Sequence, residues 1–594
     1  MWTHRSLDEI QTLMAVARGE RPADLALVGG QVLLVQSGEI RPGDVAVAGR
    51  RIAYVGPDRP VVGPQTRVVD CTGKIVAPGY IEPHCHPAPM ANPVEYARAL
   101  LRTGTTTVVA DTLFLLSHAD PGLWGEFLEI FNRMPVQFLW FLRLHPQAHS
   151  PDEDRFELDL LETVLPLASV VTVGEVTRWA DLYRGDESLL RKVQRARRAG
   201  KRAEGHNPGV SYARLQALVA AGLSSDHEAI DTDQARERLR AGLYVMLRHS
   251  SLRRDLPELA VVALGAGPAI GRVMMTADGA DPAFIRRYGY MDGLVRVAMH
   301  GGIPPICAYA MATMNPATYY GLDEEIGTVA PGRLADLLVL RSLEDPTPEL
   351  VVAKGQIAAE AGRVLAPFPQ IEWERYFPAR YAPAWHPRPE WFVLRGEGRT
   401  LSVPAIRLEN PVITRREDLT LRVRDGLADL PEGVVLVALL DHRARWIVRT
   451  ALVNFVRRLG GLASTYNVAN EILVYGQDPD DMAAATRRVL ELGGGVVLVE
   501  GGRTVFEFPL PHIGMAGPQP FDEVADRIER LTELLAARGY PHHDVPYTLM
   551  FLPFDSLPDL RLTYRGLWDV KAGRSILPRE MLSAEQDSPP DRAK

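Results

Sequence analysis

The segment PGYIEPHCH, residues 78–86, carries two histidines at the end of a short apolar run. These are His84 and His86, with one residue between them. Residues two apart in a strand point the same way, so both imidazoles can reach one metal ion from the end of that strand. For this pair alone, a chance occurrence on a surface strand remains an alternative.

Further potential metal ligands follow at or just after the ends of later apolar runs. In chain order they are Glu175, His206, His227 and Asp278. Imidazole and carboxylate ligands suit Zn, Mn, Fe or Co. Together with His84 and His86 they suffice for two ions, which Glu175 is able to bridge. Two such ions lower the pKa of a bound water and polarise a substrate together. The pattern predicts hydrolytic attack on an sp² carbon, with Asp278 holding a metal and moving the proton.

Each of these residues also has an ordinary structural explanation. His206 lies in EGHNPG, where Asn-Pro-Gly signals a turn, and His227 in SSDHE could cap a helix or pair with Asp226. Glu175 could be a surface acid, and Asp278 could be a helix cap or a turn residue. Their repeated placement at strand ends, in one order, favours the joint metal site over chance.

The elements that must position these ligands lie in residues 78–330, where apolar runs alternate with amphipathic helical stretches. The candidate strands are IVAPGYIEPH, TTTVVAD, VQFLWFLRL, VVTVGEV, RAEGH, GLSSDH, LYVMLR and GRVMMTAD. Eight β–α units in about 250 residues match a (β/α)8 TIM-type barrel, whose reactive residues sit at the C-terminal ends of strands. A doubly wound sheet is the alternative, but it does not bring ligands from so many strands to one point.

Different patterns flank this region. Residues 1–77 read as a helix over 1–20 followed by short β runs, and similar β runs return in residues 331–410 before a linker. We expect the two pieces to form one composite β-sandwich domain with the barrel inserted. Residues 411–594 mix strands with helices and predict a separate C-terminal α+β domain.

Composition excludes several classes of protein. The chain has 594 residues, a net charge of −8 and no basic block, which argues against nucleic-acid binding. Its three cysteines have no paired spacing, as expected in a reducing cytosol. We see no signal-peptide pattern and no run long enough to cross a bilayer. The sequence therefore predicts a cytoplasmic protein with no membrane or nucleic-acid partner.

The order of these motifs resembles the amidohydrolase superfamily and, within it, the adenine deaminases. The strings that carry the resemblance are ADLALVGGQVLL, PGYIEPHCH, EYARALLRTGTTTVVAD, VGEV, EGHNPG, SSDHE, MATMNPATYYGLDEEIGTVAPGRLADLLVL, GGGVVLVEGGRTVFEFPLPHIG and YTLMFLPFDSLPDLRLTYRGLWDV. The resemblance implies a two-metal barrel enzyme of purine metabolism that hydrolyses adenine to hypoxanthine and ammonia through a metal-activated hydroxide. It implies Mn, Fe or Zn as the divalent ions, a nucleobase or related heterocycle as the partner, and a homodimer as one option.

The resemblance also implies a role for each residue. His84 and His86 would bind the first metal, and His206 and His227 the second. Glu175 would bridge the ions in the catalytic centre, where many relatives use a modified lysine. Asp278 would bind metal and shuttle the proton. Glu228, next to His227, would face a ring nitrogen of the base, although a role at a helix start is equally consistent with its position.

Three segments depart from the adenine deaminase pattern. Pro87–Met90 replace Ile-Glu-Ser-Ser after the paired histidines, and Asp111 is followed by Thr-Leu-Phe in place of Pro-His-Glu. Residues 466–471 lack the histidines and the aspartate usual there. Another aminopurine, an aminopyrimidine or a cyclic amide is therefore an alternative substrate, because a pocket discriminates strongly when its polar groups change. A non-catalytic binding protein is a third reading, which retention of all the ligand positions disfavours.

Overall fold

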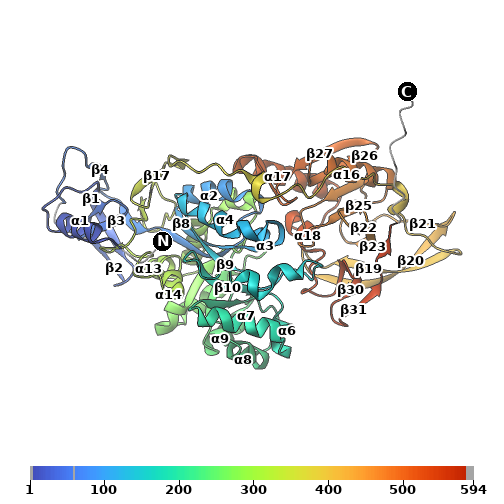
Figure 1. Cartoon of the computed structure of the whole chain (residues 1–594), viewed down its shortest axis with the longest axis horizontal. Helices are drawn as coiled ribbons and strands as arrows, with labels where there is room; N and C mark the ends of the chain where they lie inside the picture. The colour runs from blue at the N-terminus through green and yellow to red at the C-terminus, as the bar shows by residue number, and fades with distance from the viewer. Residues whose placement is uncertain (1–4, 58–59, 583–594) are drawn as a thin grey trace. The chain divides into compact units, whose positions relative to one another are not determined.

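The computed structural model describes residues 5–57 and 60–582, which form two units (Figure 1). One unit comprises residues 1–145 and 154–372, and the other comprises residues 146–153 and 373–594, within the described ranges. The first unit contains a barrel and a β domain. The second contains a large mixed sheet with its own helices.

Eight parallel strands form one sheet in the order β6, β8, β9, β10, β11, β12, β13, β14. Their bounds are Tyr80–Cys85, Thr105–Asp111, Gln137–Leu142, Val170–Val176, Arg202–Gly205, Ser225–Asp226, Tyr244–Arg248 and Val273–Thr276. The first and last strands, β6 and β14, also lie against each other, so the sheet is nearly closed. The predicted TIM-type barrel is confirmed, and every predicted strand contributes to it.

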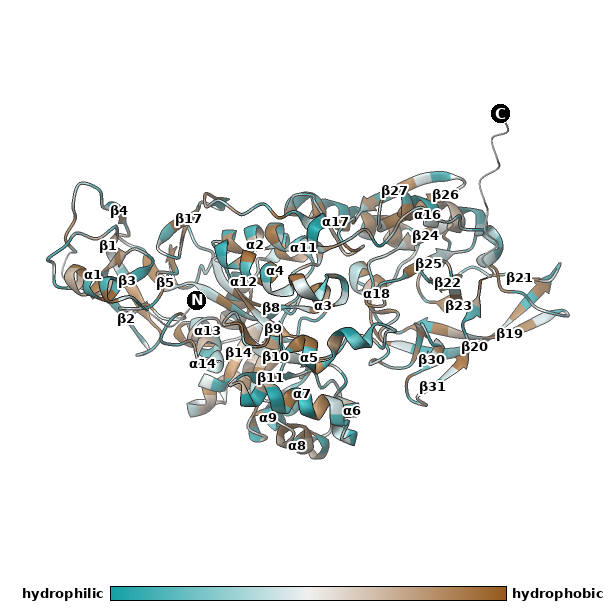
Figure 2. Ribbon diagram, viewed as in Figure 1, coloured by the Kyte–Doolittle hydropathy of each residue, from teal (hydrophilic) through white to brown (hydrophobic). Residues whose placement is uncertain are grey.

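Helices follow most of these strands and cover the outside of the barrel. They are α2 (Pro93–Arg102), α3 (Leu113–His118), α4 (Trp124–Ile130), α5 (Leu158–Leu161), α6 (Trp179–Arg184), α7 (Glu187–Arg198), α8 (Tyr212–Ala220), α9 (Thr232–Arg240), α10 (Leu256–Leu264), α11 (Pro282–Tyr288), α12 (Met291–His300), α13 (Pro305–Met311) and α14 (Met314–Tyr320). Helix α7 is typical: Leu189, Val193 and Ala196 are buried, while its many arginines are polar surface residues (Figure 2). This amphipathic spacing is why the segment forms an outer helix.

The run IVAPGYIEPH, predicted as one strand, is two. Strand β5 (Ile75–Pro78) belongs to the β domain, and β6 begins the barrel after Gly79. A Cβ at Gly79 would lie 2.2 Å from the hydroxyl oxygen of Thr106, so the chain can pass this close to β8 only with glycine. The break lets one apolar run serve two sheets.

The β domain is one nine-stranded sheet, and its strands come from the chain segments before and after the barrel. Its strands are β1 (Leu25–Leu34), β2 (Glu39–Ala48), β3 (Arg51–Gly56), β4 (Arg67–Asp70), β5, β15 (Leu337–Leu340), β16 (Leu350–Ala353), β17 (Gln356–Glu360) and β18 (Arg363–Val364). The pieces join where β5 pairs antiparallel with β15, which confirms the expected composite domain. Helix α1 spans Leu7–Ala17, shorter than the predicted 1–20, of which residues 1–4 lie outside the described residues.

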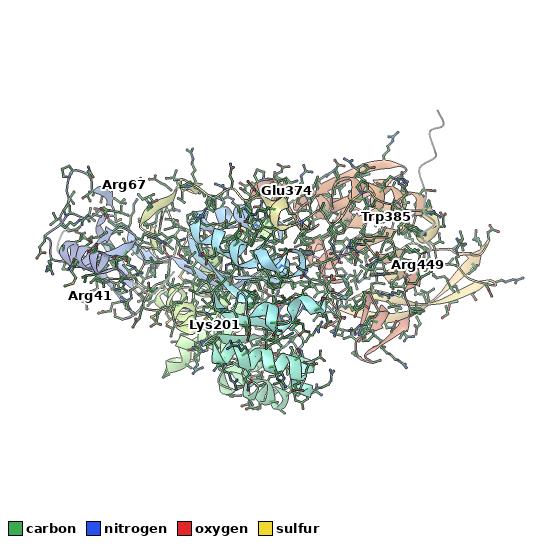
Figure 3. The ribbon with its side chains drawn as sticks, in the orientation of Figure 1. Arg41, Arg67, Lys201, Glu374, Trp385 and Arg449 are labelled. Carbon is green, nitrogen blue, oxygen red and sulfur yellow. The ribbon has the colours of Figure 1, made fainter. Side chains whose placement is uncertain are left out.

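The second unit centres on a ten-stranded mixed sheet. Its strands are β19 (Thr400–Leu408), β20 (Thr414–Arg424), β21 (Leu427–Ala428), β22 (Val434–Leu440), β23 (Trp446–Val453), β24 (Gly461–Ser464), β25 (Ile472–Gly476), β26 (Gly495–Glu500), β27 (Arg503–Pro509) and β32 (Glu580–Met581). A small sheet of β29 (Leu560–Thr563), β30 (Gly566–Asp569) and β31 (Arg574–Leu577) and the helices α15 (Trp373–Tyr376), α16 (Pro479–Glu491), α17 (Phe521–Ala537) and α18 (Val545–Phe551) complete it. Trp385, labelled in Figure 3, packs half-buried against the core of this unit.

The expected linker within residues 331–410 therefore needs correction. Strand β19 pairs with β20 and β23 and so belongs to the C-terminal sheet. The alternation at the start of TLSVPAIRL, in which Val403 and Ala405 are buried and Ser402 is exposed, is the strand signal that the linker assignment overlooked.

A buried ion pair organises the loops after β11 and β12, which carry His206 and His227. Arg238 of α9 is fully buried and donates from Nε to Asp226 Oδ1 at 2.5 Å and from a terminal nitrogen to the Asn207 carbonyl at 2.8 Å. The other oxygen of Asp226 accepts from the backbone and side-chain nitrogens of Asn207, at 3.1 and 2.6 Å. Asp226 and Arg238 thus hold the residues adjacent to both histidines.

Replacing Arg238 by methionine will lower the free energy of unfolding by about 3–5 kcal/mol, because it leaves the Asp226 charge buried without its partner. Chemical denaturation measures this. Arg236→Met on the same helix is the matched control, since the ion pair of Arg236 with Asp233 is exposed and 3.9 Å long, and such pairs contribute about 0–1 kcal/mol. Equal losses in the two variants would contradict the role of the buried pair.

Candidate metal centre

All the predicted ligands lie at the C-terminal end of the barrel, and the structure brings them together. Their ligand atoms form overlapping groups in which all atoms lie within 4.8 Å of one another. These groups are His84, His227 and Asp278; His84, His86 and Glu175; and Glu175, His206 and His227. The shared members imply one continuous centre rather than separate sites.

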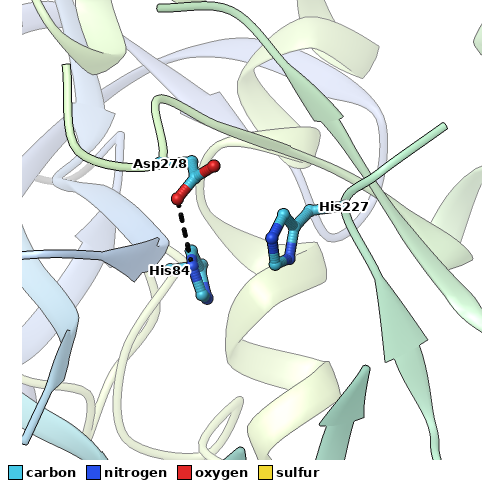
Figure 4. A group of neighbouring side chains, drawn as sticks. All are labelled: His84, His227 and Asp278. Carbon is cyan, nitrogen blue, oxygen red and sulfur yellow. Dashed lines mark ion pairs between the residues drawn. The ribbon is translucent and has the colours of Figure 1, made fainter. Parts of the chain in front are cut away.

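The first part of the centre joins β6 to the segment after β14. Asp278 Oδ1 lies 3.2 Å from His84 Nε2 and 3.1 Å from His86 Nε2. Figure 4 shows the contact with His84 and the ring of His227 beside it. Phe141 stacks on the His84 ring, with centroids 4.7 Å apart and planes 11° from parallel. The orientation of this buried imidazole is therefore held by packing as well as by charge.

Glu175, at the end of β10, connects this part to the other two histidines. Its Oε2 lies 2.9 Å from His206 Nδ1, 3.5 Å from His227 Nε2 and 4.0 Å from His84 Nε2. The rings of His206 and His227 approach to 3.2 Å between Nδ1 and Nε2. One carboxylate oxygen thus contacts rings from both parts of the centre.

These residues fit divalent cations. Ligand atoms bound to one ion at 2.0–2.1 Å in tetrahedral geometry lie about 3.3 Å apart, close to the contacts above. Both ring nitrogens of His84 and Nδ1 of His227 are buried without a hydrogen bond among the described residues, although carboxylate oxygens lie beside them. Buried charges gathered in this way are normally paired or bound to metal.

The electrostatics of the centre favour positive charge at the rings. Burial opposes protonation of His86, but Asp111 and Asp278 outweigh it and raise the pKa of His86 to about 9. Burial likewise opposes protonation of His227, yet Glu175 and Glu204 help raise its pKa to about 10. A region that stabilises cationic rings this strongly also suits a bound cation.

Gly174 allows β10 to approach β11 at this point. Its φ is +123°, and a Cβ there would lie 2.6 Å from the Glu204 carbonyl oxygen. An L-residue would be strained in this conformation and would clash with the neighbouring strand. The glycine of VGEV therefore has a physical role in setting Glu175 beside the other ligands.

Two buried arginines occupy the centre and were not predicted. Arg143 donates to Glu175 Oε1 at 2.9 Å. Arg248, at the end of β13, places one nitrogen 2.6 Å from both Glu228 Oε1 and Asp278 Oδ2. Burial opposes ionisation of Asp278, but Arg248 and His84 outweigh it and hold its pKa well below its usual range. Asp278 is therefore ionised at neutral pH in this arrangement.

Glu228, predicted to face the substrate, is held by arginines. Besides Arg248, the guanidinium of Arg253 lies 2.6 Å from Glu228 Oε2. Burial opposes its charge, but Arg253, His206 and Arg248 lower the pKa of Glu228 to about 2. Its Oε1 lies 3.7 Å from His206 Nδ1, so the carboxylate borders the metal ligands. As an ionised group it can accept a hydrogen bond but cannot donate one.

Two further acids contact the ligand histidines and were missed. Asp111 Oδ2 lies 2.8 Å from His86 Nδ1, and Glu204 Oε1 lies 3.1 Å from His84 Nδ1. Both have a sequence signal, since Asp111 ends TTTVVAD and Glu204 stands two residues before His206. Arg143 and Arg248 also end strand-like runs, so a search of every strand end for charged residues would have found the set.

The altered stretch 466–471 uses its polar groups within the second unit. Asn467 Nδ2 donates to the Glu471 carbonyl at 2.7 Å. The Glu471 carboxylate accepts from the backbone nitrogen of His442 at 2.6 Å and lies 2.9 Å from its ring Nδ1. These contacts explain the residue types found there as parts of a local hydrogen-bond network.

Family models match two regions of the chain: the amidohydrolase family over residues 75–358 and the adenine deaminase C-terminal domain over residues 411–574. A Halalkalibacterium halodurans protein provisionally named adenine deaminase is 34% identical over 98% of this chain and 99% of its own length. The chain belongs to the adenine deaminase-like amidohydrolases. It is accordingly a hydrolytic enzyme that acts on C–N bonds, in a family that generally uses divalent metals.

Other relatives also match this chain over nearly the full length of both proteins. The adenine deaminase of Rubrobacter xylanophilus is 33% identical over 94% of this chain and 95% of its own length. The adenine deaminase of Cenarchaeum symbiosum is 31% identical over 96% and 95%. Among solved structures, the dihydropyrimidinase of Brevibacillus agri is 15% identical with a TM-score of 0.45, covering 57% of this chain and 96% of that chain.

In the described residues, no helix is both long and apolar enough to cross a membrane.

Replacing Glu175 by glutamine will reduce the metal content of protein reloaded with Mn²⁺ by at least one ion per chain. The amide lacks the negative charge of the carboxylate, whose Oε2 contacts the rings of His84, His206 and His227. Elemental analysis of chelator-treated and reloaded protein measures the content. Glu187→Gln, at an exposed acid on α7, is the control and will retain the wild-type content. Unchanged content in Glu175→Gln would contradict the bridging assignment.

Proposed function

We propose that this enzyme hydrolyses adenine to hypoxanthine and ammonia with two divalent metal ions, Mn, Fe or Zn. The proposal is carried by one observation: ligands from the ends of β6, β10, β11, β12 and β14 converge within one buried centre. Similarity to named adenine deaminases over nearly the whole chain supports the substrate. In the reaction a water oxygen bonds to C6 of the purine, and the bond from C6 to the amino nitrogen breaks.

The metal ions would lower the pKa of the attacking water and polarise the purine ring. Asp278, ionised beside Arg248, accepts a proton from the water and delivers it to the departing amino group, so that ammonia leaves neutral. Arg143 holds one oxygen of Glu175 and leaves the other directed at the histidine rings. Glu228 accepts a hydrogen bond from an N–H of the base, since its carboxylate is ionised.

Deamination of a different heterocycle by the same chemistry is the second candidate. The residues after His86 favour it, because Ala88, Pro89 and Met90 are apolar where adenine deaminases usually carry Glu-Ser-Ser, and Pro89 and Met90 are buried. A pocket that has lost such groups loses discrimination for the substrate edges they would bind. Another aminopurine, an aminopyrimidine and a cyclic amide are the substrates to compare.

Ammonia release from adenine tests the proposal, using protein stripped by chelation and reloaded with Mn²⁺. Asp278→Asn is expected to lower kcat by about 10²–10⁴-fold through loss of the proton carrier. Asp278 has a φ of +46°, a left-handed conformation that asparagine tolerates, so the change removes charge without new backbone strain. Measuring the metal content of the variant separates loss of proton transfer from loss of metal.

Two outcomes would argue against adenine. Wild-type protein with two bound ions and no ammonia release from adenine would exclude it, and turnover of another compound in the panel would identify the second candidate. Turnover that persists unchanged in Asp278→Asn would exclude Asp278 as the proton carrier.

A further inference from the structure

Glu204 is a fully buried acid inside the barrel for which the proposed reaction has no direct use. It lies in β11, two residues before His206, so strand alternation directs both side chains to the same face. Its Oε1 lies 3.1 Å from His84 Nδ1 and 3.4 Å from His227 Nδ1. A single oxygen therefore contacts histidines delivered by β6 and by the segment after β12.

Both of those rings turn their other nitrogen toward the metal centre. His84 Nε2 faces Asp278 at 3.2 Å, and His227 Nε2 faces Glu175 at 3.5 Å. A neutral imidazole carries one N–H and one free lone pair. When Nδ1–H points at Glu204, the lone pair of Nε2 is left for a cation, and carboxylates commonly orient metal-bound histidines in this way.

We propose that Glu204 is a positioning residue that sets the tautomer and orientation of His84 and His227 together, and so couples the two metal positions through one carboxylate. The inference rests on the proposed metal-dependent function. It assigns Glu204 no contact with the substrate. Its consequence is that one substitution beneath the centre weakens the binding of both ions.

The surroundings of Glu204 argue against a purely structural role. Among the described residues, neither of its oxygens has a partner in hydrogen-bond geometry, and no lysine or arginine forms an ion pair with it. The rings of His84 and His227 are its ion-pair contacts in that part of the chain. The described contacts of this carboxylate are thus with two ligand rings from different strands, and a carboxylate in that position can orient both.

Asp111 offers a matched comparison. Its Oδ2 contacts Nδ1 of a ligand histidine in the same manner, at 2.8 Å from His86, but it reaches only that one ligand ring in the described contacts. Glu204 and Asp111 therefore differ in how many ligand rings one carboxylate orients. If these carboxylates act by orienting the rings, removing the Glu204 carboxylate will affect both metal-binding steps, and removing the Asp111 carboxylate will affect one.

Calorimetric titration of metal-free protein with Zn²⁺, against a competing chelator, tests the inference. Glu204→Gln is expected to weaken both binding steps by about 10–100-fold, and Asp111→Asn to weaken one step by a similar factor. Metal-free Glu204→Gln is expected to fold with a lowered thermal midpoint, because the amide leaves the buried rings of His84 and His227 without their carboxylate. A merely structural role would lower that midpoint but leave both Zn²⁺ affinities unchanged at temperatures where the variant is folded.

Wild-type affinity for both ions in Glu204→Gln, or a loss confined to one step, would overturn the inference. If Glu204→Gln does not fold, Glu204→Asp replaces it: its shorter side chain cannot reach both rings and is expected to weaken at least one step, and wild-type affinity would again overturn the inference. A wild-type protein that binds two Zn²⁺ ions but leaves adenine unchanged would overturn the proposed substrate alone. Absence of Zn²⁺ binding by the wild type would overturn both.

Discussion

The contact between β6 and β14, where the barrel closes, is the constraint on which the rest of the centre depends. Buried Glu82 of β6 accepts from the Thr276 hydroxyl at 2.6 Å and from the Ala277 backbone at 2.9 Å. His84 follows Glu82 on the same face of one strand, and Asp278 follows Thr276 beyond the other. A slip along this contact would move Asp278 away from the histidines, because strand register decides which side chains meet.

The second constraint is the cost of burying many ionisable groups together. Two arginines of the centre each contact two acids: Arg143 lies 2.9 Å from Glu175 and 3.6 Å from Asp111. Arg248 similarly spans Glu228 and Asp278. Arginine contacts help to hold the pKa values of Glu175, Glu228 and Asp278 below their usual range although these acids are buried, so they stay ionised at neutral pH.

The strand-end ligands could be predicted from the sequence because the barrel imposes a local rule. A histidine or acid that follows an apolar strand points to the mouth, so each ligand carried its signal in its own neighbourhood. The sequence did not predict Arg143, Arg248 and Glu204 as site residues. Charged residues are common at strand ends, and only their convergence in the folded barrel distinguishes these three. The division of residues 75–85 at Gly79 was not predicted for a related reason. The close approach to Gly79 is made by Thr106, which belongs to another strand.

The sequence by itself determined the barrel, the composite β domain and the order of the ligands, since hydrophobic periodicity and strand-terminal residues are local properties of the chain. Tertiary structure alone decided which ligands share a centre, that Glu228 lies between two arginines, and that Glu204 meets two rings at once. Those relations join residues that are far apart in the chain and that meet through packing and strand register. No local segment of the sequence determines the distance between two residues across the barrel. The charge state of each acid was settled there too, because it depends on which cations folding brings within reach.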